Sequence, residues 1–376
     1  MQQTCLSNHV LGKATMARGG DHIFSVALDF GTTYSGFAYS STSDFQNRPD
    51  KIYTNEAWNS GGQGLLSHKT PTVLLLTSNK KFEAFGYEAE NLYADLALDG
   101  LHKDRYYFRR YKMKLHGDKR IHENTMIEDE SGKPLPALLV FKFSIKYLKD
   151  KFFEILNKQG LDIKNSEIMW TLTVPAIWCE SAKSFMRKAA VEAGICCEQL
   201  KLSLEPEAAS LLCQHIPIEK TETGLSVADV GTKYMVIDLG GGTADITVHE
   251  KLSHGKLKEI HKASGGPWGG TAVDEGFIQL LVRIVGGPVI TRFRKEFTAD
   301  YLEMMREFEV SKRTLDPHKD SSFKVRVPPT LSQVCEAETD EDLSSLVNEK
   351  NSPYAGKLRV MADKLIIERK LMMEIF

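Results

Sequence analysis

The sequence lacks the features that mark several large classes of protein. Its 376 residues contain no apolar run near the roughly 18 residues of a membrane-spanning helix. The 48 basic and 50 acidic residues leave a net charge of -2, which gives no sign of a nucleic-acid-binding surface or a membrane anchor. The six cysteines form no CxxC pair, so a structural zinc site is not expected. These absences favour a cytoplasmic protein with reduced thiols.

Two common phosphate-binding motifs and a signal peptide are also missing. The sequence has no GxxxxGK[ST] P-loop, and no GxGxxG opens a helix in the Rossmann manner. The start of the chain has no continuous apolar core, so we expect a mobile tail over 1–22 and no signal peptide. The rest has an ordinary composition, 42% hydrophobic and 26% charged, in a chain long enough for two domains.

One pattern occurs twice. In ALDFGTTYSG (27–36) and KYMVIDLGGGTADITVHE (233–250), an apolar strand ends in an aspartate, small residues make a turn, and a second strand returns. The two aspartates are Asp29 and Asp238, in different halves of the chain. A module repeated at that distance predicts two related lobes, not a short-period repeat protein.

The two glycine turns suit a phosphate. Glycine lets backbone N–H groups approach an anion without an intervening Cβ, and successive N–H groups form a concave nest. Thr32, Thr33 and Thr243 would add hydroxyl donors. Asp29 and Asp238 would repel a bare phosphate, but Mg²⁺ uses one or two carboxylates together with phosphate oxygens. The pattern therefore predicts a Mg²⁺–nucleotide held between two hairpins; two ordinary β-hairpins with glycine turns are the alternative.

Hydrophobic periodicity predicts the surrounding elements. Apolar residues at helical or strand spacing predict helices over 136–156, 181–195 and 364–376, and strands over 70–78 and 167–178. The helix over 181–195 should begin at Ser181 and end at Gly194.

Several motifs together resemble the actin-like ATPase superfamily and, within it, the seventy-kilodalton heat-shock chaperones. ALDFGTTYSGFA and VIDLGGGTADITV resemble the superfamily's first and second phosphate loops. Segments that resemble the chaperone branch are TLTVPAIWCESAKSFMRKAAVEAGI (171–195), LSLEPEAASLL (202–212) and FEVSKRTL (308–315). Segments that resemble the divergent heat shock 70 kDa protein 12 group are FGYEAENLY (85–93), YYFRRYKMKLH (106–116) and SGGPWGGTAVDEGF (264–277).

The resemblance, which covers roughly 23–376, implies an α/β fold of the actin-like ATPase type. Each of its two lobes would be built on a ribonuclease-H-like mixed sheet with flanking helices. Lobe I is expected over 23–228 and lobe II over 229–376. The family's last nucleotide-domain segments would follow Phe376. We therefore expect a chain truncated at its C-terminus, with an incomplete second lobe.

The resemblance also assigns roles to residues. Asp29 and Asp238 would hold Mg²⁺, mainly through its waters. The phosphates would be wrapped by Gly31, Thr32, Thr33 and Tyr34 in the first turn and by Gly240, Gly241, Gly242 and Thr243 in the second. The catalytic residues would be Asp245 near the nucleophilic water, Glu205 as a base or water-orienting group, and Lys112 near the γ-phosphate. Lys114 is the alternative to Lys112.

A second group of residues would contact the nucleoside. Glu309, Lys312 and Arg313 match positions that grip ribose and adenine, and their i, i+3, i+4 spacing puts them on one helix face. A stripe of surface ion pairs is the alternative. Gly269 and Gly270 would provide a third phosphate contact, and Asp274 would cap the helix that follows.

These roles imply an ATP-binding, chaperone-like heat-shock protein of the stress response. It would hydrolyse ATP slowly to ADP and phosphate and close its lobes on Mg-ATP. Its partners would be nucleotide and co-chaperones or client proteins, not nucleic acid. One alternative is a pseudo-ATPase scaffold with weak or no hydrolysis. Another is a small-molecule kinase on the same fold, although no segment indicates a sugar-binding insert. The slow ATPase and the pseudo-ATPase scaffold differ in whether the γ-phosphate of ATP is released.

Overall fold

The computed structural model describes residues 22–48, 50–55, 58–59, 66–116, 121–213, 229–316, 318, 322–349 and 352–376. The tail predicted over 1–22 lies outside these residues except for His22. The chain forms two compact units: unit 1 is Met1–Glu90 with Tyr106–Trp268, and unit 2 is Asn91–Arg105 with Gly269–Phe376. These units do not coincide with the two expected lobes, because residues 229–268 belong to unit 1, and the lobe boundary at 228 stays a prediction.

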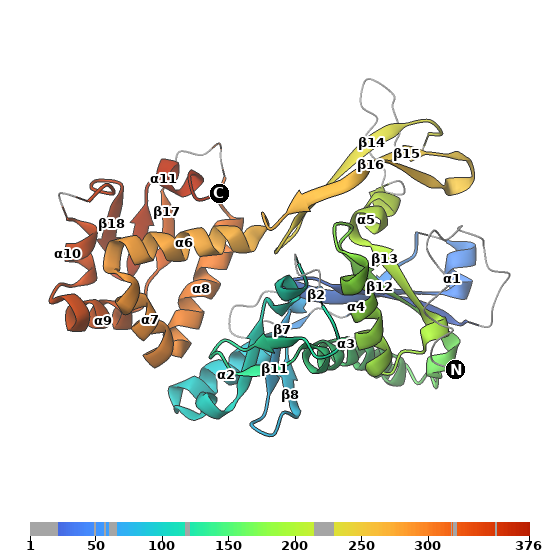
Figure 1. Cartoon of the computed structure of the whole chain (residues 1–376), viewed down its shortest axis with the longest axis horizontal. Coiled ribbons are helices and arrows are strands. Elements are labelled where there is room, and N and C mark those ends of the chain that lie inside the picture. Colours follow the sequence, from blue (N-terminus) through green and yellow to red (C-terminus); the bar gives the residue numbers. More distant parts are fainter. Residues whose placement is uncertain are drawn as a thin grey trace. The chain divides into compact units, whose positions relative to one another are not determined.

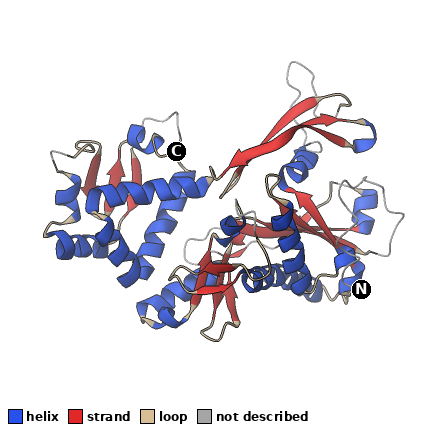
Figure 2. Cartoon of the chain, in the orientation of Figure 1, coloured by secondary structure: helices blue, strands red, loops and turns tan. Residues whose placement is uncertain are grey.

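A six-stranded mixed sheet forms the centre of unit 1 (Figures 1 and 2). Its strands are β1 (Phe24–Phe30), β2 (Tyr34–Ser41), β3 (Tyr53–Thr54), β6 (Thr70–Pro71), β12 (Ile168–Val174) and β13 (Leu200–Leu204). The order is β13-β12-β1-β2-β3, and β6 also pairs with β2. Strands β1, β12 and β13 are parallel, whereas β1 and β2 form an antiparallel hairpin. The strand, turn and strand expected from the opening motif are therefore confirmed.

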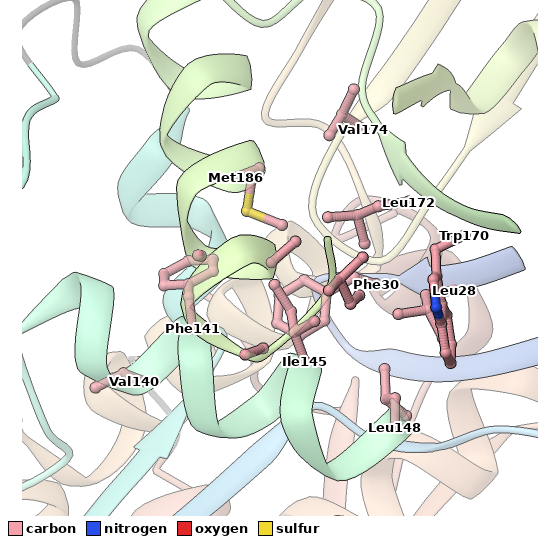
Figure 3. Close-up of a cluster of buried hydrophobic side chains, with 14 of the residues drawn as sticks. Leu28, Phe30, Val140, Phe141, Ile145, Leu148, Trp170, Leu172, Val174 and Met186 are labelled. Atoms are coloured by element: carbon pink, nitrogen blue, oxygen red, sulfur yellow. The ribbon is translucent and has the colours of Figure 1, made fainter. Parts of the chain in front are cut away.

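The core of unit 1 lies between this sheet and helices α3 (Ala137–Lys158) and α4 (Glu180–Glu192). Burial alternates along β1 and β12, so every second side chain points toward the helices. Figure 3 shows Leu28, Phe30 and Leu172 from the strands meeting Phe141 of α3 and Met186 of α4. Each fully buried side chain of this kind stabilises the fold by about 1.5–3 kcal/mol. This packed core therefore holds the sheet in place, including the side chains on its opposite face.

Smaller elements surround the central sheet of unit 1. A second sheet has the order β8 (Phe82–Phe85), β7 (Val73–Leu76), β9 (Tyr106–Arg109), and two short ladders join β4 (Trp58–Asn59) to β5 (Leu66–Ser67) and β10 (Met126–Glu128) to β11 (Pro134–Pro136). The helices are α1 (Thr42–Asn47), α2 (Tyr87–Leu98), which continues into unit 2, and α5 (Glu205–Cys213). Short 3-10 helices are η2 (Tyr111–Leu115), η3 (Asn165–Glu167), η4 (Cys197–Gln199) and η5 (Ser253–Gly255).

The expected strand over 70–78 is two strands, β6 and β7, in different sheets. The break falls at Thr72, whose backbone N–H donates to the carbonyl oxygen of Thr33 at 2.8 Å. This bond ties the segment to the first glycine turn, after which the chain leaves the edge of β2 and joins β8 and β9.

The second glycine motif forms the antiparallel strands β14 (Lys233–Leu239) and β15 (Ala244–Lys251). Strand β16 (Leu257–Gly266) pairs with β15 and completes a three-stranded sheet. Figure 1 shows it as the yellow to orange ribbon. Asp238 on β14 lies opposite Asp245 on β15. Gly265 has a φ of +155°, and a Cβ there would lie 2.0 Å from the carbonyl oxygen of Ala244, so no other residue fits. The predicted similarity of the two hairpins is confirmed at the level of strand, turn and strand.

Unit 2 combines helices with a three-stranded sheet. Its helices are α6 (Gly270–Val285), α7 (Gly287–Glu296), α8 (Thr298–Arg313), α9 (Pro329–Thr339), α10 (Leu343–Val347) and α11 (Arg369–Met373), with the 3-10 helix η1 (Leu101–Asp104). The sheet order is β17 (Phe323–Arg326), β19 (Lys364–Ile367), β18 (Leu358–Met361). The rings of Phe277 and Phe308 stack at 4.1 Å between α6 and α8, and Arg306 donates to Asn91 at 3.2 Å.

Two predictions about helix limits are wrong. The segment 364–376 contains strand β19 before α11, because Leu365, Ile366 and Ile367 form an unbroken buried run, which suits the central strand of a sheet. Helix α4 begins at Glu180 with Cys179 at its N-cap, one residue before Ser181.

No single helix in the described parts of the chain is long and apolar enough to cross a membrane. Helices α6 and α7 satisfy that test of length and composition only when taken together, and they are bent by 115°.

Candidate functional site

Three polar side chains come together because three parallel strands end at one edge of the central sheet. Asp29 stands near the end of β1, Thr173 near the end of β12, and Glu205 directly after β13. The carboxyl ends of parallel strands are where α/β sheets usually place their ligands. The hydroxyl of Thr173 donates to Oδ1 of Asp29 at 3.3 Å. Asp29 and Thr173 therefore share the face of the sheet that points away from α3 and α4.

A buried ion pair joins η2 to the end of β13. Lys112 is 3% exposed, and its Nζ lies 2.7 Å from Oε1 of Glu205 and 5.3 Å from the ring centre of Trp178. Burial raises the pKa of Glu205, and the charges of Asp29 and Asp238 act in the same direction, while Lys112 opposes the shift. Lys114, the alternative to Lys112, is exposed on the same 3-10 helix. The structure thus places Lys112 and not Lys114 among the carboxylates.

The second hairpin brings two more carboxylates to this group. Burial raises the pKa of Asp238, and the negative charge of Asp29 raises it further. Asp245 is 1% exposed and accepts a hydrogen bond from the Thr243 hydroxyl at 3.1 Å. Burial and the charge of Asp238 raise the pKa of Asp245 as well. The aspartates of the two motifs therefore lie close enough to interact electrostatically, and a shared site for Mg²⁺ and nucleotide stays a prediction.

The turns of the two hairpins are in direct contact. A Cβ on Gly241 would lie 2.1 Å from Oγ1 of Thr33, and one on Gly242 would lie 2.6 Å from Oγ1 of Thr32. The same Cβ on Gly242 would lie 2.4 Å from the sulfur of Met113, next to Lys112. The second turn thus needs glycines because the threonines of the first turn and η2 fill the space above its backbone.

The other predicted turn residues shape their own loops. A Cβ on Gly31 would lie 2.2 Å from the carbonyl oxygen of Tyr34, so the first turn closes too tightly for a side chain there. In the second turn the N–H of Gly240 donates to the carbonyl oxygen of Thr243 at 2.9 Å. Of the eight residues predicted to wrap phosphate, seven lie in the two turns that meet in unit 1, and Tyr34 begins the strand that follows the first turn.

Sequence reasoning missed two residues that support the first turn. The Thr72 hydroxyl donates to the carbonyl oxygen of Gly31 at 2.8 Å and lies 2.7 Å from the hydroxyl of Ser35. The Nζ of Lys69 lies 2.5 Å from Oδ2 of Asp29. The only sign of these two residues in the sequence is that KTPT (69–72) precedes an apolar run. That pattern does not show with which strand the segment will pair.

In unit 2 the predicted nucleoside-contacting residues gather on helix α8. The Nζ of Lys312 lies 2.6 Å from Oε2 of Glu309, and Arg313 contacts the other oxygen of Glu309 at 2.7 Å. Burial alone would raise the pKa of Glu309, but its ion pairs with Lys312 and Arg313 outweigh burial and hold the pKa below its usual range. The expectation that these residues share one helix face is confirmed.

The expected role of Asp274 as a helix cap is wrong. Helix α6 begins at Gly270 with Gly269 at its N-cap, and Asp274 lies one turn inside the helix. Asp274 is buried, and its Oδ1 lies 2.6 Å from the Nζ of Lys312, which also donates to the carbonyl oxygen of Gly270 at 3.1 Å. Lys312 therefore joins the start of α6 to the end of α8.

The residues of unit 1 fit a hydrated cation with an anion better than a directly bound metal. Within the described ranges, no three His, Cys, Asp or Glu side chains converge to ligate an ion. The group has more carboxylates than ammonium groups: Asp29, Glu205, Asp238 and Asp245 against Lys69 and Lys112. Several buried side-chain atoms of the described residues have no hydrogen-bond partner, and two of them belong to this group: Oδ1 of Asp245 and Nε1 of Trp178, whose ring lies beside Lys112. Such atoms generally contact water or a ligand, and Mg²⁺ usually keeps several waters.

Comparison with known proteins bears out the resemblance stated from the motifs. The chain is 36% identical over 372 residues to "Heat shock 70 kDa protein 12A" of Mus musculus, a match that covers 85% of this chain and 54% of the relative. It is 36% identical over 354 residues to "Heat shock 70 kDa protein 12B" of Homo sapiens, covering 81% of this chain and 51% of the relative. No family model matches.

A more distant match is "Chaperone protein DnaK" of Elusimicrobium minutum (strain Pei191), which is 26% identical over 194 residues, 52% of this chain and 26% of the relative. The chain spans about half the length of the two curated group-12 relatives.

Proposed function

Because this chain belongs to the heat shock 70 kDa protein 12 group of the seventy-kilodalton heat-shock family, and so has the actin-like ATPase fold, we propose that it binds Mg-ATP between its two glycine hairpins. One observation carries the proposal. The buried Lys112–Glu205 pair stands in one group with the aspartates of both hairpins, where the two turns meet. A pair of unrelated hairpins would have no reason to converge on a buried lysine.

Each group in unit 1 has a proposed task. Asp29 and Asp238 would hold Mg²⁺ through its waters, and the two turns would donate hydrogen bonds to the phosphates. Bound Mg²⁺ would offset the negative charge of the phosphates. An ammonium has three donors, and Glu205 takes one of those of Lys112, so the remaining donors would serve a phosphate oxygen. Burial strengthens such a contact because little water competes for it.

Two carboxylates are suited to position the attacking water. The partnerless Oδ1 of Asp245 would accept a hydrogen bond from that water. Glu205 would orient the water or take its proton, and its raised pKa brings the carboxylate closer to the range of a working base. Because Lys112 holds Glu205 in one place, the same ion pair would fix both the phosphate contact and the base.

The resemblance assigns further nucleotide contacts to residues of unit 2. Glu309, Lys312 and Arg313 would contact ribose and adenine, and Gly269 with Gly270 would give the third phosphate contact at the start of α6. We propose that the lobes, divided as predicted at 228, close on Mg-ATP, that slow hydrolysis to ADP and phosphate drives this closure, and that closure is the signal to client proteins or co-chaperones. The ribonuclease-H-like sheet expected in each lobe is part of this proposal.

A pseudo-ATPase is the second candidate, and one observation favours it. Lys69 already neutralises Asp29, one of the two proposed metal carboxylates. A chain that balances this charge internally would need no Mg²⁺ there and could serve as a scaffold with weak or no hydrolysis.

Thermal unfolding of the purified chain, with and without Mg-ATP, tests binding. A ligand at about 100 times its Kd should stabilise the folded state by roughly 2.7 kcal/mol. We expect a higher midpoint with Mg-ATP, a much smaller rise for Asp238→Asn, and a normal rise for the control Asp162→Asn, which changes an exposed loop carboxylate. No rise in the folded wild-type chain would refute the binding proposal. Release of phosphate from bound ATP, lost in Glu205→Gln, would separate the ATPase from the scaffold.

A further inference from the structure

Both oxygens of the Asp29 carboxylate have a partner from the protein. Oδ2 lies 2.5 Å from the Nζ of Lys69, and Oδ1 accepts the hydroxyl of Thr173 at 3.3 Å. The Asp29 side chain is 39% exposed and that of Lys69 is 52% exposed, so the ion pair faces solvent. The ammonium therefore sits on the carboxylate that a hydrated cation would use.

The sequence supplies a specific path for this lysine. Asp29 on β1 lies directly opposite Gly36 on β2. A Cβ on Gly36 would lie 3.2 Å from Cγ of Lys69 and 3.0 Å from the carbonyl oxygen of His68. The stem of Lys69 thus crosses β2 at a residue without a side chain and reaches the carboxylate on the next strand.

The backbone next to Lys69 is anchored. Thr70 pairs with Ser35 in the sheet and is 1% exposed, and the Thr72 hydroxyl donates to the carbonyl oxygen of Gly31 in the first turn. Lys69 is therefore an exposed side chain on a fixed backbone support. Its ammonium can leave Asp29 without disturbing the segment that carries it.

The charge of Lys69 reaches beyond Asp29. It acts on Asp238 in the second hairpin, where it and Lys112 oppose the effects of burial and of Asp29. Replacing Lys69 by a neutral residue would leave the two aspartates facing each other with less positive charge nearby. The electrostatic attraction of a divalent cation to this place would then increase.

We propose that Lys69 is an internal counter-ion that competes with Mg²⁺ for Asp29 and thereby sets how strongly nucleotide binding depends on metal. This inference rests on the proposed function. With Lys69 on Asp29, the first turn accepts nucleotide without metal, because the ammonium offsets the repulsion between carboxylate and phosphate. When Mg²⁺ arrives, the ammonium must move away. An exposed ion pair is weak, so Lys69 tunes metal binding without blocking it.

The test compares Lys69→Gln, Lys69→Arg and the control Lys201→Gln, which changes an exposed lysine on β13 of the same sheet. Three quantities are measured by calorimetry and thermal unfolding: the Kd of ADP in EDTA, the Kd of ADP in saturating Mg²⁺, and the Mg²⁺ concentration that gives half of the metal effect. For Lys69→Gln we expect that Mg²⁺ concentration to fall up to roughly fivefold and metal-free ADP binding to weaken to a similar extent. Lys69→Arg, which keeps the charge, should resemble the wild type.

The outcomes separate this inference from the function on which it rests. If the wild type binds Mg-ADP and Lys69→Gln has the wild-type Mg²⁺ midpoint and metal-free affinity, the counter-ion role is wrong and nucleotide binding stands. If the wild type binds no ADP under either condition, the proposed function fails. Titration with Mg²⁺ alone then decides the inference: greater stabilisation of Lys69→Gln than of the wild type supports competition for Asp29, and equal or absent stabilisation overturns it.

Discussion

The Nζ of Lys112 lies 2.7 Å from Oε1 of Glu205, and this ion pair connects two segments more than ninety residues apart in the sequence. Lys112 belongs to the short helix η2, and Glu205 begins α5 after a strand of the central sheet. Both side chains are removed from most solvent, 3% and 18% exposed. Each charge is therefore tolerated because the other is present.

We expect Lys112→Met to destabilise the nucleotide-free chain by about 3 kcal/mol, because breaking a buried pair leaves one charge uncompensated. Urea unfolding with a constant m-value measures the loss. The double variant Lys112→Met, Glu205→Met should recover much of it, since no charge is left alone. A double variant that is as unstable as the two single variants combined would show that the residues act independently.

Asp238→Asn should stabilise the nucleotide-free chain while it weakens the Mg-ATP effect. The pKa of Asp238 is raised in the folded state by burial and by Asp29, so the charged form of Asp238 lowers the stability of the folded chain. Asparagine removes that charge, and we expect the free energy of unfolding to rise by no more than about 1 kcal/mol, the usual size of an interaction between partly exposed charges. A stability loss in Asp238→Asn would contradict this account.

The same carboxylates predict a pH dependence. The pKa values of Glu205, Asp238 and Asp245 are raised in the folded state, so between the unfolded and folded values the folded chain binds more protons. Toward pH ~4, near the unfolded pKa values, these groups are largely protonated in the folded chain and do not lower its stability. As pH rises through their folded pKa values, they ionise and the stability of the folded chain falls. The advantage of Asp238→Asn over the wild type should accordingly shrink as pH falls. Denaturant unfolding of both chains between pH ~4 and ~8 measures this difference.

Gly241→Ala should separate the two turns. Its Cβ would fall 2.1 Å from the hydroxyl oxygen of Thr33, a distance that forces one turn to move. We expect a loss of about 1–3 kcal/mol in stability, as for other overpacked sites, and a smaller midpoint rise with Mg-ATP. Gly287→Ala is the matched control, because no atom lies within 4 Å of the added Cβ and its φ lies outside the left-handed region. Equal stability of the two variants would mean that the turns are not in contact.

The local pattern of the sequence predicted the two hairpins and the i, i+3, i+4 face of α8 because these depend on neighbours along the chain. The positions of Lys69 and Thr72 could not be predicted, since they depend on the sheet edge that the segment after the loop joins. Asp274 was misjudged for a similar reason. A polar residue near a helix start suggests a cap, and the sequence does not show that Lys312, thirty-eight positions later, will pair with it. The terminal segment was misread because a short run of buried apolar residues fits either a helix or a central strand.

Lys312 and Arg313 should differ although they are adjacent on α8. Lys312 is 10% exposed and contacts both Asp274 and Glu309. Lys312→Met would break the buried pair with Asp274, while Glu309 keeps Arg313, and should cost about 3 kcal/mol in the absence of nucleotide. The side chain of Arg313 is 58% exposed, and Arg313→Gln should change stability by less than about 1 kcal/mol. If Arg313 contacts the nucleoside as proposed, the Kd of Mg-ADP should nevertheless rise in Arg313→Gln. Unfolding curves and calorimetric titration on the same samples distinguish the two effects, and an unchanged Kd would leave Arg313 as a surface ion-pair residue of α8.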